Sequence, residues 1–353
     1  MPQARLGAGS WQLEGDALSA LRAKLSLGRK TLKEVYGSPL YGIKTGLNDA
    51  FIVNRATHDA LVRDDPKSAD LLKPFLVGED LQKWRIESED RWIIYIPKNS
   101  VNVDDYPAIR DHLTAFRKEL EGRATKQAWF ELQQAQADYV TDFAGRKLLY
   151  PEISQGAKFA IDESGYFPLN KLFYINSDSF GLSAFLNSTL NWAYLFGICS
   201  PLRGGQWRLE LRAQYVETIP IPDGLVANAD LVRLGRVCQT AASERHSLSR
   251  SVGHEILRDL APGGLTSKLP GVLQNWPLLD FAAFRATVKK HFKQDIPQAE
   301  CNDWEAKLIA GAKRVAELTA EIRAAEREID QIVHHLFDLT PDEVALIEAS
   351  VAQ

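Results

Sequence analysis

One short loop, residues 41–51 (YGIKTGLNDAF), contains side chains that could bind a nucleic acid. Lys44 can form an ion pair with a phosphate, and the Asn48 amide can form two hydrogen bonds with an adenine edge. Two glycines allow a ligand to approach the backbone closely, and Thr45 adds a hydroxyl group. The alternative is a hairpin turn in which Thr45 and Asn48 bond to their own backbone.

A second segment, residues 201–212 (PLRGGQWRLELR), offers similar chemistry around a diglycine turn. Arginine and glutamine are side-chain types that read guanine and adenine in the major groove. The alternative is a surface hairpin with ordinary arginines. The candidate DNA-binding residues of this segment are Arg203, Gln206, Trp207, Arg208 and Arg212.

Further basic residues lie between these two segments, and they could contact phosphates or simply hydrate helix surfaces. They are Arg117, Lys118, Arg123, Lys126, Arg146 and Lys147. We include Lys126 and Lys147 among the candidate DNA-binding residues. Composition alone favours neither nucleic-acid binding nor an ordinary surface.

The sequence lacks the patterns of several enzyme classes. Residues 37–45 approach a phosphate-binding P-loop, but Ile43 separates Gly42 from Lys44 and Pro39 interrupts the turn. The nucleophile-elbow, zinc-protease and EF-hand patterns do not occur. Three cysteines without CxxC spacing predict buried thiols, and the histidine spacing predicts no metal site. We therefore expect binding rather than turnover, with no catalytic residues.

Short strands and helices must position the first loop and the basic residues. The sequence predicts strands at residues 50–53, 92–96, 158–161 and 171–175, and helices at 68–76, 106–120 and 182–196. These elements do not alternate regularly, which argues against a doubly wound parallel sheet. We expect an α+β fold in this part of the chain, with a mixed, β-rich domain.

The segment IPIPDG, residues 219–224, marks a boundary near residue 222, because its two prolines force an extended backbone. Helices are predicted beyond it at residues 231–252 and 304–336. The longer helix would extend about 50 Å and needs a packing partner, for which the 231–252 helix is the intramolecular candidate. We expect an α-helical, coiled-coil-like domain. The stripe of the longer helix comprises Trp304, Leu308, Gly311, Val315, Leu318, Ile322, Ala325, Ile329, Ile332 and Leu336.

Length and composition predict a globular protein of two domains, since the chain has 353 residues, 45% of them hydrophobic and 25% charged. No apolar run could span a bilayer and no secretory signal is present, so we expect a cytoplasmic protein with no membrane partner. The net charge is −4, although residues from 300 onward include twelve acidic and only five basic side chains. A phosphate-facing surface is therefore expected before residue 300, and the acidic tail should face another partner.

Several ordered motifs resemble the TaqI-like C-terminal specificity domain. This domain is the target-recognition part of type IIG restriction–modification enzymes and related adenine-N6 DNA methyltransferases. The closing segment at 326–348 is similar to the last helices of these enzymes, so the resemblance covers nearly the whole chain. The motifs are the loop at 41–51, KPFLVGEDLQKW at 73–84, WIIYI at 92–96, KLLYPEIS at 147–154, AFLNSTLNWAYL at 184–195 and QYVETIPIP at 214–222.

The resemblance implies sequence-specific recognition of double-stranded DNA. Full-length members of the family also carry a methyltransferase domain with an Asn-Pro-Pro-Tyr/Phe motif and a glycine-rich loop for S-adenosylmethionine, and neither pattern occurs here. We therefore expect S-adenosylmethionine to bind a separate adenine-N6 methyltransferase domain or subunit, and this chain to have no cofactor and no enzymatic activity by itself. The chain would be a C-terminal fragment or the product of a split gene.

The expected organisation has three parts. Residues 1–35 form an N-terminal helix and linker, residues 36–222 a DNA target-recognition domain, and residues 223–353 a helical spacer or docking domain. The alternative is a helical interaction or scaffold protein, in which the long helix is the working part and the α+β domain is a non-binding remnant of a specificity domain.

Overall fold

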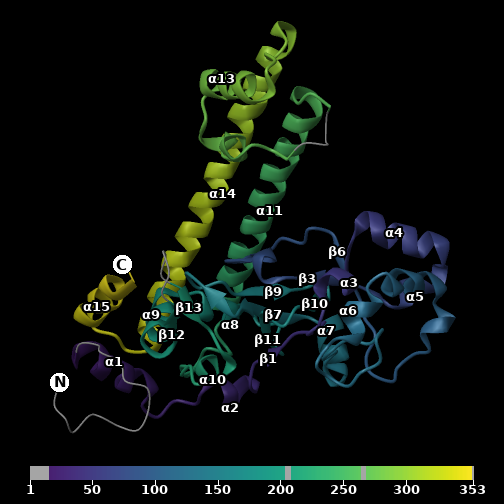
Figure 1. Cartoon of the computed structure of the whole chain (residues 1–353). Coiled ribbons are helices and arrows are strands. Elements are labelled where there is room, and N and C mark those ends of the chain that lie inside the picture. The colour runs from purple at the N-terminus through teal and green to yellow at the C-terminus, as the bar shows by residue number, and fades with distance from the viewer. Residues whose placement is uncertain (1–15, 203–207, 264–267, 352–353) are drawn as a thin grey trace. The chain divides into compact units, whose positions relative to one another are not determined.

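Figure 1 shows a computed structural model of the chain, in which residues 16–202, 208–263 and 268–351 are described. Contacts between residues divide the chain into two compact units. Unit 1 comprises Met1–Arg233 and Ile329–Gln353, and unit 2 comprises Leu234–Glu328. The predicted α+β fold is confirmed, because a strand-rich region around residues 40–210 precedes a helical region. Within the described ranges, no helix is both long and apolar enough to cross a membrane.

Two four-stranded sheets form the centre of unit 1. The first is antiparallel, in the order β1 (Leu40–Tyr41), β11 (Leu172–Ile175), β7 (Lys147–Pro151) and β9 (Ala160–Asp162). The second has the order β10 (Phe167–Pro168), β3 (Leu72–Leu76), β6 (Arg91–Ile94) and β2 (Ile52–Asn54), with β10 parallel to β3. Every residue of β7 and β11 is buried, as expected for strands covered on both faces.

Smaller sheets complete the strand-rich region. One has the order β12 (Ser200–Leu202), β13 (Arg208–Glu210) and β8 (Ile153–Ser154), and the other pairs β4 (Leu81–Gln82) with β5 (Arg85–Ile86). In the three-stranded sheet both pairs are antiparallel.

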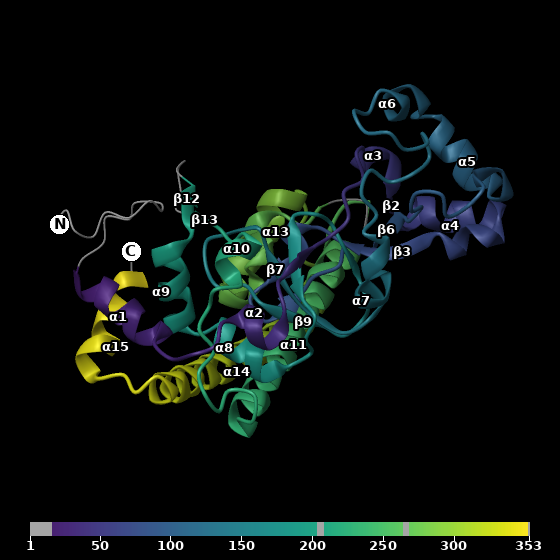
Figure 2. The ribbon, with the colours of Figure 1, turned by 90° about the horizontal axis from the view of Figure 1, so that it is seen from below.

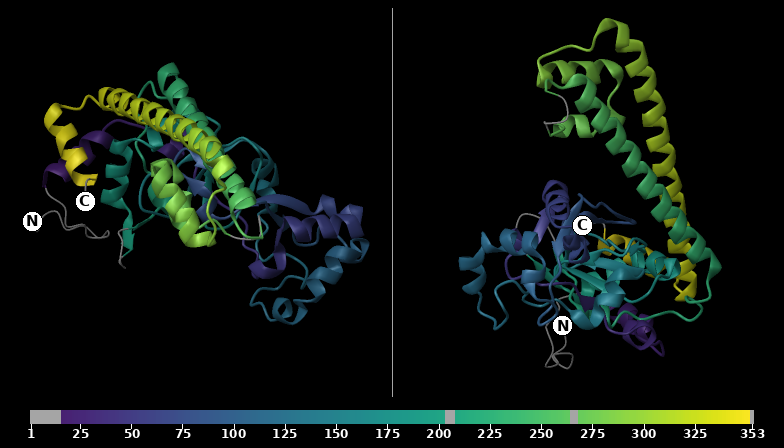
Figure 3. Two further views of the ribbon diagram at one scale, coloured as in Figure 1. Left: turned by 90° about the horizontal axis from the view of Figure 1, so that it is seen from above. Right: turned by 90° about the vertical axis from the view of Figure 1, so that its right-hand side faces the viewer.

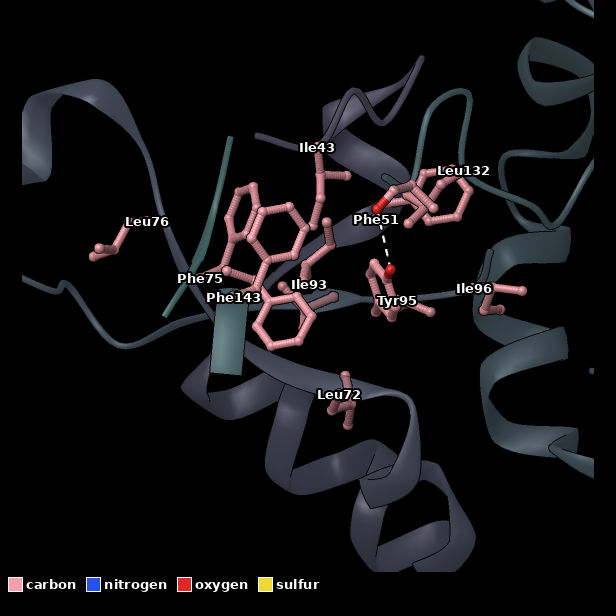
Figure 4. Packing of buried hydrophobic residues seen from close by; sticks show 14 of the residues in the cluster. Ile43, Phe51, Leu72, Phe75, Leu76, Ile93, Tyr95, Ile96, Leu132 and Phe143 are labelled. Carbon is pink, nitrogen blue, oxygen red and sulfur yellow. Dashed lines mark hydrogen bonds between the residues drawn. The ribbon is translucent and has the colours of Figure 1, made fainter. Parts of the chain in front are cut away.

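One hydrophobic core contains side chains from both four-stranded sheets. Figure 4 shows Phe75, Ile93 and Phe143 packed close together in this core. The Tyr95 hydroxyl donates a hydrogen bond of 3.0 Å to the carbonyl of Ala135, so its polar end is satisfied inside the protein. Each buried side chain of this size stabilises the fold by about 1.5–3 kcal/mol.

The helices of unit 1 gather in two groups, which Figures 1 and 2 show from different directions. The first group, beside β2 and β6, contains α3 (Asn48–Phe51), α4 (Arg55–Asp64), α5 (Pro107–Thr114) and α6 (Arg117–Glu121). The second contains α1 (Asp16–Ser26), α9 (Thr189–Ile198) and α15 (Pro341–Val351), where Lys24 of α1 and Glu343 form an ion pair of 2.6 Å. The remaining helices are α2 (Leu32–Tyr36), α7 (Val140–Ala144), α8 (Phe180–Leu186) and α10 (Ala213–Val216).

The helix predicted at residues 68–76 was wrong. A short 3-10 helix, Pro66–Asp70, is followed after one residue by strand β3. Leu71, Leu72 and Leu76 have the spacing of a helix, but Pro74 would remove a backbone donor from its interior. In β3, Pro74 is the last residue paired with β6, and pairing with β10 begins at the next residue, so a strand accommodates the proline.

Two other predicted helices are each divided in the structure. The helix at 106–120 separates into α5 and α6, and the helix at 182–196 separates into α8 and α9. The second break has a clear cause, because the Ser188 hydroxyl accepts a hydrogen bond from the Asn191 amide and caps α9. The preceding Asn187 side chain bonds to the backbone of Phe159, which fixes the turn.

Most of unit 2 is an antiparallel pair of long helices, α11 (Ala229–Leu260) and α14 (Cys301–Leu336), which run side by side in Figures 1 and 3. The predicted partnership is confirmed by contacts along the pair. Arg314 forms an ion pair of 2.8 Å with Glu244, and Arg245 donates a hydrogen bond of 3.1 Å to Thr319. Shorter helices α12 (Gly271–Gln274) and α13 (Phe281–Phe292) lie at one end of the pair.

The apolar stripe of α14 follows the predicted spacing as far as Ile329 and then changes register. Beyond that residue the buried side chains are Val333 and Phe337 rather than Ile332 and Leu336. A straight helix drifts away from a seven-residue repeat, so one face cannot point at the same side indefinitely. The change falls where α14 enters unit 1, and Phe337 there stacks on Phe185 with ring centroids 6.1 Å apart.

Gly311 allows a buried tryptophan to pack directly on the α14 backbone. A Cβ added at Gly311 would lie 2.6 Å from the ring of Trp276, which is fully buried. We predict that Gly311→Ala lowers the free energy of unfolding by about 1–2 kcal/mol, because overpacking of 1–3 kcal/mol exceeds the helix-propensity gain. Urea unfolding followed by circular dichroism measures this effect.

Gly271→Ala is the matched control, because no heavy atom lies within 4 Å of a Cβ added there. We expect this variant to be as stable as the unchanged chain or slightly more stable. Equal stability of the two variants would contradict the proposed close packing of Trp276.

Candidate nucleic-acid interface

The loop that follows β1 is held close to the neighbouring backbone. A Cβ at Gly42 would lie 2.2 Å from the carbonyl oxygen of Pro168, so only glycine fits there. The Ile43 amide donates to that carbonyl at 2.8 Å, and the Asn170 amide donates to the carbonyl of Ile43 at 2.8 Å. Gly46 has a φ of +82°, a left-handed conformation that also favours glycine. The backbone of this loop is therefore held in place by the segment that contains Pro168 and Asn170.

A second loop lies beside it, and we call residues 42–48 and 122–134 the paired loops. Lys44 and Gln134 exchange two backbone hydrogen bonds of 2.9 Å each, and the Gln133 amide donates to the carbonyl of Thr45 at 3.3 Å. The two segments, far apart in the sequence, therefore form one local structure. It carries four of the predicted residues: Lys44, Thr45, Asn48 and Lys126.

Arg123 joins the paired loops through its guanidinium group. This half-buried side chain contacts Gly46, where an added Cβ would lie 2.9 Å from its Cδ. Burial lowers the pKa of Arg123, and nearby Glu131 opposes this effect. Hydrogen bonds from the guanidinium group to backbone carbonyls offset the free-energy cost of burying its charge. They belong to Thr45 at 3.1 Å, Leu120 at 3.0 Å, Ala128 at 3.3 Å, Trp129 at 2.8 Å and Glu131 at 2.8 Å.

The predicted residues of the paired loops differ in accessibility. Thr45 is buried, and its hydroxyl donates a hydrogen bond of 2.6 Å to the Asn48 side-chain oxygen. This bond leaves the Asn48 NH2 group without a partner among the described residues, so its remaining capacity is that of a donor. Lys44, Asn48 and Lys126 are exposed, and neither lysine forms an ion pair within the described ranges. The surface therefore offers two ammonium groups and an amide donor to an acceptor-rich ligand.

The predicted residues of the second segment lie on another sheet. Arg203, Gln206 and Trp207 lie outside the described residues. Arg208 begins β13, is exposed, and forms no ion pair with any part of the chain that the structure describes. Arg212 is also exposed but pairs with Glu210 at 2.9 Å, and this hydrogen bond raises the pKa of Arg212.

Lys147 lies in the interior rather than on a surface that could face DNA. It is 0% exposed, and its ammonium group pairs with the equally buried Asp162 at 2.6 Å. The same group donates hydrogen bonds to the carbonyls of Phe143 and Gly145, while the amide of Tyr166 donates to Asp162. Burial lowers the pKa of Lys147, and the Asp162 carboxylate opposes this effect. Phosphate contact by Lys147 does not fit this environment, because its donors already have buried partners.

Comparison with known proteins assigns part of the chain to a family. Residues 73–221 match the model of the TaqI-like C-terminal specificity domain. This chain contains a TaqI-like specificity domain. The predicted resemblance is thereby confirmed for these residues, and Lys126, Arg208 and Arg212 lie inside the matched range.

The rest of the comparison concerns the helical region and the solved structures. Residues 226–333, which include most of α11 and α14, match a domain of unknown function (DUF8810). No curated protein matches the chain. A type IIL restriction–modification enzyme, MmeI, solved in complex with DNA, is similar with a TM-score of 0.47 and 13% sequence identity over 89% of this chain. This chain spans only 35% of that protein.

Sequence analysis did not predict that Arg123 joins the paired loops, and it identified this residue only as one of several basic side chains. Four of its acceptors are nearby in sequence, but the carbonyl of Thr45 comes from a distant loop. No local spacing signals such an interaction.

We predict that Asp162→Ala lowers the free energy of unfolding by about 3–5 kcal/mol, because the Lys147 ammonium would remain buried without its counter-charge. The double replacement Lys147→Met with Asp162→Leu should cost less than this single change, since it buries no charge. Urea unfolding of both variants tests the prediction. A double variant less stable than Asp162→Ala would contradict it.

We predict that Arg123→Gln loosens the paired loops and lowers the free energy of unfolding by about 1.5–3 kcal/mol, the range for hydrogen bonds to a charged group. Hydrogen exchange at the amides of Lys44 and Gln134 should become faster. Arg117→Gln is the control, because among the described residues Arg117 forms only an exposed ion pair with Glu121 and a contact over the Trp129 ring. If these amides exchange at the same rate in Arg123→Gln as in the unchanged chain, Arg123 does not hold the two loops together.

Proposed function

We propose that the chain is a DNA-recognition module of a site-specific adenine-N6 DNA methyltransferase or restriction–modification system. The match of residues 73–221 to a specificity domain carries this proposal. Exposed donors on the paired loops and at Arg208 support it, because phosphate oxygens and the guanine edge are acceptors. Recognition would reside in residues 36–222, preceded by the helix and linker of residues 1–35.

Methyl transfer would belong to another domain or subunit that binds S-adenosylmethionine. Transfer to adenine N6 needs a pocket for a base turned out of the duplex, whereas target choice needs contacts in the neighbouring groove. These two tasks can reside on separate domains. The helical region, residues 223–353, would space the recognition surface from that catalytic partner or dock it.

The alternative of a purely helical interaction protein has less support. In the described residues, the apolar stripe of α14 packs against α11 of the same chain, as the contacts of Cys238 and Arg245 with α14 illustrate. The stripe that would bind a partner helix is therefore covered. The match to a specificity domain also gives the strand-rich unit a role that a remnant would not require.

The proposal predicts that the purified chain enriches one short sequence from a pool of random duplexes at moderate salt. Phosphate contacts weaken as salt rises, but base readout persists as a preference among sequences. Failure to enrich any sequence, with weak and uniform binding to all duplexes, would overturn the proposal. Transfer of labelled methyl groups from S-adenosylmethionine to DNA by this chain alone would show that methyl transfer does not need another domain or subunit.

Arg208→Ala should weaken binding to the enriched duplex by about 1–3 kcal/mol, the range for a good base contact, and weaken binding to a scrambled duplex less. Arg212→Ala is the matched control, because Arg212 is already neutralised by Glu210. Fluorescence anisotropy measures both dissociation constants. Equal losses on the two duplexes would assign Arg208 to a phosphate instead.

A further inference from the structure

Helix α13 of unit 2 has one face anchored in the core and another that is basic. Phe284, Val288 and Phe292, spaced by four residues, are buried in the hydrophobic cluster of unit 2. Lys289 and Lys290 lie in its last turn and Lys293 at its C-cap, and all three are exposed. We call these three residues the lysine cluster.

The charge of the lysine cluster is largely uncompensated. Asp295 is shared, because it forms an ion pair of 2.7 Å with Arg285 and a longer one of 3.6 Å with Lys289. Lys290 and Lys293 form no ion pair within the described residues. A favourable interaction with the negative end of the helix dipole explains one or two cations there, but it is worth only about 0.3–1 kcal/mol each.

The composition of this face favours a phosphate backbone over a protein surface. The remaining exposed residues of α13 are Ala282, Ala283, Ala286 and His291, so no exposed tryptophan, tyrosine or phenylalanine accompanies the lysines on this helix. Protein interfaces depend on tryptophan, tyrosine and arginine anchors and are depleted in lysine. Lysine is instead a flexible point charge suited to phosphates.

The spacing of the lysines also fits a nucleic-acid strand. Lys289 and Lys293 are four residues apart, about 6 Å along the helix axis. One strand of a DNA duplex presents a phosphate about every 3.4 Å of its axis. Each ammonium group can therefore reach a different phosphate without bending the duplex.

We propose that the lysine cluster of unit 2 is a second, sequence-independent DNA contact that binds the phosphate backbone. The inference rests on the proposed function, because it assumes that DNA is the ligand of the chain. It adds a role for the region of unknown function, since residues 226–333 include α13. Unit 1 would choose the site and the lysine cluster would increase affinity for any duplex.

The test compares the full chain with the variant Lys289→Gln/Lys290→Gln/Lys293→Gln on a labelled 40-base-pair duplex of mixed sequence, between about 50 and 200 mM salt. Each lost phosphate contact reduces the slope of log affinity against log salt by about 0.9, so the slope should fall by about 2–3. Affinity at about 100 mM salt should fall at least tenfold. Preference for the enriched sequence over a scrambled one should not change.

The matched control is Arg250→Gln/Lys313→Gln/Arg323→Gln, which removes the same charge from exposed positions on α11 and α14. The control should keep the slope of the unchanged chain, and equal slopes for the two triple variants would overturn the proposal. A lysine-cluster variant that binds DNA normally but loses binding to a labelled polyglutamate peptide would reassign the surface to an acidic protein. If the unchanged chain binds no duplex, the proposed function itself is wrong. This outcome is separate from failure of the lysine-cluster proposal, because it does not depend on any variant.

Discussion

The guanidinium group of Arg123 is the interaction on which the candidate recognition surface depends. A cation taken partly out of water is stable only if its donors are satisfied, and here five backbone carbonyls satisfy them. Four of these carbonyls lie near Arg123 in the sequence, and the fifth, that of Thr45, belongs to the other of the paired loops. Because Gly46 has no side chain, the arginine lies directly against the first loop. The two loops are therefore held in one arrangement without a ligand, and preorganisation of this kind lowers the entropy cost of binding.

Ion pairing within unit 1 distinguishes structural cations from available ones. Arg91 is surrounded by Asp80, Glu79 and Glu89, and Lys147 has its own buried carboxylate. These charges hold strands and turns in place and leave little to offer a ligand. Lys44, Lys126 and Arg208 are exposed and lack such partners among the described residues. This difference, rather than the number of basic residues, distinguishes the side chains that are available to an anionic ligand.

In unit 2, packing stabilises two long helices, α11 and α14. Their apolar stripes cover one another, ion pairs such as Arg314–Glu244 flank the seam, and Trp276 closes one end against Gly311. A helix of this length would be marginal alone, because helical stability in water comes mainly from packing of an apolar face. The same core holds α13 in place and thereby fixes the surface on which its lysines stand.

The sequence by itself determined the features that follow from local periodicity. The spacing of apolar residues predicted both long helices and their partnership, and the irregular order of strands and helices predicted the α+β fold. Ordered motifs identified the specificity domain, and residue types made Lys44, Asn48 and Arg208 candidate contacts to DNA. Tertiary structure decided the features that depend on distant partners. The carboxylate of Asp162 placed Lys147 in the core, pairing with β6 and β10 made residues 72–76 a strand, and packing on Phe185 buries Phe337 where the sequence pattern predicted Leu336. The physical reason is the same in all three cases. Burial and strand pairing depend on contacts with residues that are distant in the sequence, and the local spacing of residues does not specify those contacts.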